Sequence, residues 1–136
     1  MILEILLVDD DPVVQYLHKT LLSKFNFPEQ KFFSNGEFAL DYILENNNQN
    51  LLFLILLDIN MPVMNGWEFL EELKKHSIKS LVKVVILTSS IDNSDKDKAK
   101  SYHQVFEFME KPLHETFICN LKSDTDLAIF IEKAII

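Results

Sequence analysis

Three places in the chain share one pattern, in which ionisable side chains stand at or just beyond the end of a short, mostly apolar run. They are Asp9 and Asp10 after Ile5–Val8, Asp58 after Leu51–Leu57, and Lys111 beyond Val105–Phe108. The run before Asp58 is apolar at every position, which is typical of a strand buried on both faces of a parallel sheet. Open α/β sheets bind ligands at the carboxyl ends of their strands, so we expect these four side chains to lie together at one edge.

Three carboxylates at this edge would need a cation. Asp9, Asp10 and Asp58 would repel one another and raise one another's pKa unless a positive charge joins them. Mg²⁺ suits such a set, because it is a hard ion that prefers oxygen ligands and keeps several waters. Asp11 is expected to do something else, since a residue in front of Pro12 is well placed to cap a helix. Taken alone, the acidic triplet is also compatible with a solvated loop.

Apolar periodicity and capping signals predict strands that alternate with single helices. The expected strands are Ile2–Val8, Lys31–Phe33, Leu51–Leu57, Leu81–Leu87 and Val105–Phe108. The expected helix signals are the Asp11 cap with an apolar stripe of Val14, Leu17, Leu21 and Phe25, a capping box of Ser34 and Glu37, the Asn65 cap, and a fourth helix over Asn93–His103. Such alternation implies right-handed crossovers. We therefore predict an α/β fold of the flavodoxin-like doubly wound type, a five-stranded parallel sheet in the order 2-1-3-4-5 with helices on both faces.

The end of the chain allows two interpretations. Ser123–Asp126 has the composition of a helix start, and apolar residues follow it at helical spacing up to Ile135. His114–Lys122 contains apolar residues but weak helical signals. One long helix and a loop before a shorter helix both remain open.

Composition agrees with one domain in a reducing compartment. Residues 1–136 are long enough to bury a core of their own and contain nothing that resembles a linker, so we expect a single domain that no output domain follows. Cys119 is the only cysteine, which rules out an internal disulfide and favours a cytoplasmic location. Glu4 interrupts an amino terminus without a basic region, so we expect no signal peptide and no membrane span. A net charge of −8 argues against direct DNA binding.

The acid pair, the lone aspartate and the Lys111-Pro112 dipeptide, in this order and each at a strand end, resemble the receiver domain of two-component response regulators. The resemblance extends from Ile2 to about Leu113 and is to the single-domain, chemotaxis-regulator-like type. It implies that Asp58 is a phosphoacceptor whose carboxylate becomes an acyl phosphate. It also implies a phosphodonor partner, either a sensor histidine kinase or a histidine phosphotransfer protein.

The resemblance assigns roles around Asp58 as well. For Mg²⁺ it implies carboxylate ligands from Asp10 and Asp58, a contact from Asp9 through water, and the backbone carbonyl of Asn60. For the phosphoryl group it implies a hydroxyl contact from Thr88 and an ion pair from Lys111. These roles agree with the chemistry of phosphoryl transfer, which depends mainly on positioning and charge neutralisation.

A switch is implied by the aromatic residue three positions before Lys111. Receivers carry there a side chain that turns inward on activation, and this chain has Phe108, which is also well suited to a core. Small residues commonly precede that aromatic, whereas Val105-Phe106-Glu107 stands here, so the geometry of the fifth strand is expected to differ. The fourth helix has few apolar residues to bury and is expected to move with the switch.

Together these patterns predict a phosphorylated switch that acts on a downstream protein target or passes its phosphoryl group onward, and that is not a conventional enzyme. A haloacid-dehalogenase-like phosphatase would need a second aspartate where Asn60 stands, and a flavodoxin would need a hydroxyl- and glycine-rich phosphate loop after the first strand. The remaining alternative is an adaptor of the same fold that needs no phosphorylation. The four histidines, at positions 18, 76, 103 and 114, show no metal-ligand spacing.

Overall fold

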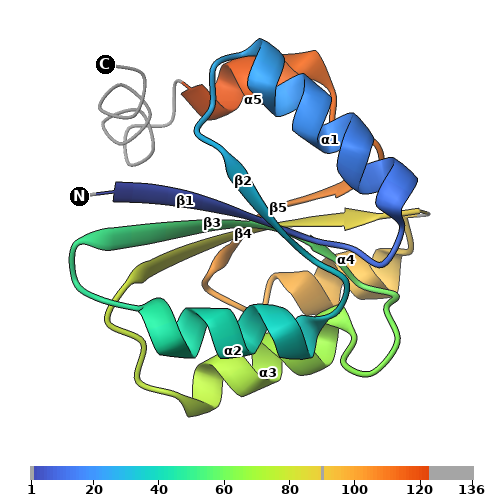
Figure 1. Ribbon diagram of the computed structural model, residues 1–136. Coiled ribbons are helices and arrows are strands. Elements are labelled where there is room, and N and C mark those ends of the chain that lie inside the picture. Colours follow the sequence, from blue (N-terminus) through green and yellow to red (C-terminus); the bar gives the residue numbers. More distant parts are fainter. Residues whose placement is uncertain (1, 90, 123–136) are drawn as a thin grey trace.

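The sheet of the protein has five parallel strands in the order β2-β1-β3-β4-β5 (Figure 1), which confirms the predicted α/β class and strand order. The computed structural model describes residues 2–89 and 91–122. Within them the elements are β1 (Ile2–Val8), α1 (Pro12–Lys24), β2 (Gln30–Phe33), α2 (Gly36–Asn46), β3 (Leu51–Asp58), α3 (Gly66–Lys75), β4 (Leu81–Thr88), α4 (Asn93–Ala99), β5 (Val105–Glu110) and α5 (Glu115–Lys122).

Helices cover both faces of the sheet, so the central strand β3 is surrounded by protein. Helices α1 and α5 lie on one face, and α2 and α3 lie on the other with α4 beside them (Figure 1). All eight residues of β3 are buried. A carboxylate at the end of such a strand is therefore held in a poorly hydrated position.

Side-chain caps begin the helices that lead away from the sheet edge. Asp11 accepts a hydrogen bond from the backbone N–H of Val13 at 2.9 Å and Asn65 caps α3, both as the sequence predicts. The structure adds a capping box between Asn65 and Glu68. The predicted capping box of Ser34 and Glu37 is wrong. Asn35 caps α2 instead, because its side chain accepts from the N–H of Phe38 and the helix begins one residue later than expected.

Helix α1 packs on the core only in part as predicted: Leu21 and Phe25 of the expected stripe contact it, but Leu17 does not. Leu17, expected on the buried stripe, is 50% exposed, whereas His18 and Leu22 are buried. Gln15 lies on the same inward side and donates to backbone carbonyls at the ends of β1 and β2. The polar His18 is thus buried where apolar periodicity predicted that Leu17 would be.

Helix α4 and strand β5 end at different residues from those predicted. Helix α4 stops at Ala99 rather than at His103, and tight i→i−3 turns follow, which allow Tyr102 to turn inward and become buried. Strand β5 continues to Glu110, two residues beyond the predicted end, so Lys111 follows it directly. The pairing of β5 with β4 shifts register between Val84 and Val85 of β4. The residues of β5 at the shift are Val105-Phe106-Glu107, which stand where small residues were expected.

Residues 115–122 form helix α5. The segment whose conformation the sequence left open between helix and loop is therefore helical from Glu115 to Lys122. The helix start predicted at Ser123 lies outside the described residues. Among the described residues, no helix has the length and apolarity needed to cross a membrane.

Candidate functional site

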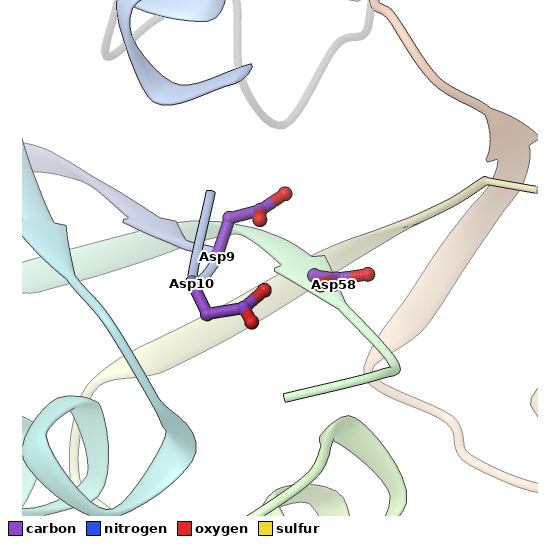
Figure 2. A group of neighbouring side chains, drawn as sticks. All are labelled: Asp9, Asp10 and Asp58. Carbon is purple, nitrogen blue, oxygen red and sulfur yellow. The ribbon is translucent and has the colours of Figure 1, made fainter. Parts of the chain in front are cut away.

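Three parallel strands deliver acidic or basic side chains to one edge of the sheet. β1 ends directly before Asp9, β3 ends at Asp58, and β5 ends directly before Lys111. Figure 2 shows the carboxylates of Asp9, Asp10 and Asp58 extending into a common space. Each of these residues offers a carboxylate oxygen, and the three oxygens lie within 4.8 Å of one another. The predicted convergence of the three acids is confirmed.

One ammonium group joins two of these carboxylates. The Nζ atom of Lys111 lies 2.6 Å from Oδ2 of Asp9 and 3.2 Å from Oδ1 of Asp58. The lysine side chain is only 11% exposed and both carboxylate side chains are buried. Ion pairs this far from water are tightly constrained, because the loss of one partner leaves an uncompensated charge.

The pKa values of the central groups reflect this crowding. Burial and the nearby charge of Asp9 raise the pKa of Asp58 to about 6, although Lys111 and a hydrogen bond from the backbone N–H of Asn60 act in the opposite direction. Burial lowers the pKa of Lys111, but the hydrogen bonds and charges of Asp9 and Asp58 outweigh it and raise the pKa overall. Asp58 is thus mainly ionised at neutral pH.

The donor set fits a hard divalent cation. Three carboxylates converge here and, among the described residues, only the ammonium of Lys111 pairs with them, contacting Asp9 and Asp58. The cluster therefore keeps an excess of negative charge that a cation with oxygen ligands would offset. Asp9 is buried and Asp10 is exposed, while Asp11 points its carboxylate into its helix cap. The triplet is therefore divided as predicted, with two acids at the site and one at the helix.

Backbone contacts fix the loop that follows β1. Oδ1 of Asp9 accepts from the N–H of Asp11 at 2.9 Å. Nε2 of Gln15 donates to the carbonyl of Asp9 at 2.7 Å and to that of Phe33 at 3.1 Å. Sequence reasoning missed Gln15, because the carbonyls that it bonds are brought together only by the fold.

The loop after β3 approaches the site closely at Gly66. The N–H of Gly66 donates to the carbonyl of Ile59 at 2.8 Å. A Cβ atom on Gly66 would lie only 2.7 Å from the backbone oxygen of Asp58. No side chain fits in that gap without moving the backbone that carries Asp58. The glycine at the first position of α3 therefore helps to place Asp58.

The other predicted residues occupy the surroundings of Asp58 and Lys111. Thr88 is the buried last residue of β4, and its carbonyl accepts from the N–H of Lys111 at 2.7 Å. Asn60 is exposed and contacts Asp58 through its N–H, and the metal contact expected of its carbonyl stays a prediction. Phe108 is partly buried against the core and lines a pocket of about 180 Å³ between α4 and β5.

Comparison with known proteins agrees with this geometry. The family model of the response regulator receiver domain matches residues 5–121. The chain belongs to the response regulator receiver family. Receivers of this family are signalling domains rather than conventional enzymes; they are phosphorylated by histidine kinases and phosphotransfer proteins, and they generally bind Mg²⁺ at an acidic pocket.

Individual relatives give the same result over most of the chain. Two-component response regulator 24 of Arabidopsis thaliana is 32% identical over 108 residues, which cover 79% of this chain and 73% of that protein. The probable methanogenesis regulatory protein FilR2 of Methanothrix harundinacea is 31% identical over 112 residues, covering 80% and 72%. A crystal structure of a two component response regulator from Cytophaga hutchinsonii has a TM-score of 0.76 at 31% identity, covering 90% and 95%.

One buried histidine near the receiver site was not predicted. His18 is 3% exposed, and its Nε2 accepts a hydrogen bond from the backbone N–H of Leu113, two residues after Lys111. Burial lowers its pKa to about 4, with a smaller opposing effect from Asp9 and a further lowering by Lys111. The ring is therefore neutral in the folded protein at neutral pH.

This burial makes stability depend on pH in a definite direction. Between pH 6.5 and about 4 the unfolded chain binds a proton at His18 that the folded chain does not, so the free energy of unfolding falls as the pH falls through that window. The loss should reach about 3 kcal/mol by pH 4, at 1.36 kcal/mol per unit of pKa. Chemical denaturation of the wild type and of His18→Gln across this range tests the prediction.

The variant serves as its own control for the other titrating groups. Asp58 has a raised pKa and contributes in the opposite direction, but it is present in both proteins, so the difference between the two curves isolates His18. Parallel curves for wild type and His18→Gln would contradict the assignment.

Proposed function

We propose that Asp58 accepts a phosphoryl group from a phosphohistidine on a sensor histidine kinase or a histidine phosphotransfer protein. The P–N bond of the donor breaks and a P–O bond to the Asp58 carboxylate forms. The observation that carries the proposal is the buried carboxylate at the end of β3, in contact with the Lys111 ammonium and beside two further acids. We treat residues 1–136 as one receiver domain.

The neighbouring residues would position and neutralise the transferred group. Asp9, Asp10, Asp58 and the carbonyl of Asn60 would hold Mg²⁺, which supplies positive charge to the phosphoryl oxygens when it is bound. Lys111 would exchange part of its contact with Asp58 for a phosphoryl oxygen, and the Thr88 hydroxyl would donate to another. Each of these side chains lies at or next to the end of its strand, which supports a common role.

Phosphorylation would change a protein-binding surface rather than start a chemical output. Phe108 lines the pocket between α4 and β5, close to the end of the strand that carries Lys111. We propose that the Thr88 side chain moves toward the phosphoryl group and that Phe108 turns into the space that Thr88 leaves. Helix α4 would then shift and present a surface to a downstream protein. The acidic net charge does not favour DNA as that target. The cytoplasmic location expected from the sequence stays a prediction.

Phosphoryl transfer is tested directly with a small donor. Incubation with acetyl phosphate and Mg²⁺ should add one phosphoryl group to the wild type and none to Asp58→Asn, as read by intact mass. Circular dichroism of the variant checks that its fold is kept. A folded wild type that stays at its original mass would favour the adaptor that needs no phosphorylation.

Two neighbouring aspartates separate metal binding from helix capping. At one hundred times its dissociation constant, Mg²⁺ should stabilise the fold by about 2.7 kcal/mol, on the order of 5–10 °C in melting temperature. Asp10→Ala should lose most of this response because it removes a carboxylate from the cluster. Asp11→Ala should keep the response but lose roughly 1 kcal/mol of stability, because it removes the cap of α1. Thermal melts with and without Mg²⁺ measure both effects, and an equal loss of response would show that the triplet is divided wrongly.

The switch is tested by hydrogen exchange with beryllofluoride, a mimic of the phosphoryl group. Helix α4 buries only Ala99 of its seven residues, so little packing holds it in place. Amide protection should change at the loops around Asp58 and also across residues 93–108. The same measurement on Asp58→Asn is the control and should show no change. A response confined to the loops would leave α4 and Phe108 uncoupled from the site.

A further inference from the structure

Two hydrogen bonds donated by backbone N–H groups hold residues 111–113, which lie in the four-residue connection between β5 and α5. The N–H of Lys111 donates to the carbonyl of Thr88 at 2.7 Å, and the N–H of Leu113 donates to Nε2 of His18 at 3.3 Å. Pro112 lies between them and has no N–H to donate. Both backbone donors of residues 111–113 are therefore engaged, the first by β4 and the second by a side chain of α1.

Helix α1 thus contacts both loops that supply charge to the site. Gln15 holds the carbonyl of Asp9 in the loop after β1, and His18 lies on the next turn of the same helix side. The two residues are three apart, a spacing that places side chains next to each other on a helix. The helix can in this way fix the distance between the acid loop and the lysine loop.

The contact requires an uncharged ring. A neutral imidazole has one nitrogen that accepts, whereas a protonated ring has two donors and no acceptor. Burial keeps His18 neutral at neutral pH, so Nε2 is available to the N–H of Leu113. A leucine at this position would fill similar space but leave the N–H without this partner.

We propose that His18 is a positioning residue for Lys111. By holding the backbone two residues after Lys111, it keeps the ammonium within reach of Asp9 and Asp58 and of the phosphoryl group that Asp58 would carry. The proposal rests on the proposed function, since it assigns His18 a part in phosphoryl transfer through Lys111. His18 itself touches none of the reacting atoms.

The first experiment uses the protein without any phosphodonor. In His18→Leu the amide hydrogen exchange of Leu113 should be faster by roughly tenfold or more, because its hydrogen bond is lost. His18→Gln should keep slow exchange, since glutamine can present an acceptor at a similar reach. The amide of Ile118, which is bonded to the carbonyl of His114 within the next helix, is the control for general loosening. An unchanged Leu113 rate in His18→Leu, or an equal change at Ile118, would overturn the proposal.

The second experiment is a double-mutant cycle on the rate of Asp58 phosphorylation by acetyl phosphate with Mg²⁺. His18→Leu should slow the reaction roughly tenfold when Lys111 is present and should have no further effect in Lys111→Ala, because residues that act through one another are not additive. His18→Gln should restore most of the rate. Equal effects in both backgrounds would show that His18 is only structural.

Failure of the proposed function gives a different result. If the wild type takes up no phosphoryl group, the NMR signal of the Lys111 ammonium replaces the rate as the second measurement. A signal that changes in His18→Leu but not in His18→Gln would support positioning of Lys111 without phosphorylation. A signal that is the same in all three proteins would overturn it.

Discussion

An imbalance of charge at the edge of a hydrophobic sheet governs this structure. The ammonium of Lys111 contacts the carboxylates of Asp9 and Asp58, and that of Asp10 lies close to both acids. Asp58 ends a strand that is buried along its whole length. Such a group of charges is tolerated only when geometry keeps the opposite signs together. The helix caps, the close approach at Gly66 and the contacts of α1 can all be understood as means of keeping that geometry. The same imbalance leaves the site ready to take up further positive charge.

The main features of the site could be predicted because they depend on local pattern. Short apolar runs identify strands, parallel strands share an edge, and ionisable residues at three strand ends must then converge. Asp11 could be separated from its two neighbours because Pro12 makes the helix start unambiguous. These inferences needed no knowledge of how the helices are rotated or how the loops pack.

The features that were predicted wrongly depend on contacts between distant segments. Ser34 and Asn35 are both good caps, and the choice of Asn35 goes with Gly36, whose N–H donates to the carbonyl of Met64 in another loop. In α1 the burial of His18 in place of Leu17 was missed, because Gln15 bonds the carbonyls at the ends of β1 and β2 and His18 lies on the same side of the helix. Helix α4 ends early because Tyr102 stacks on Trp67 and donates its hydroxyl hydrogen to Glu71 of α3.

The register shift in β5 has a consequence for how side chains alternate along that strand. In an unbroken strand, residues three apart face opposite sides of the sheet. Val105 and Phe108 nevertheless both pack on the side of α2 and α3, while Phe106 packs on the side of α1 and α5, and Glu107 is left in solvent. The phase of the strand is thus reset at Phe106, upstream of Phe108 and Lys111. The bulge takes up one extra residue ahead of Phe108, so residues 107–110 pair one for one with residues 85–88 of β4 and lead to Lys111 in an unbroken register.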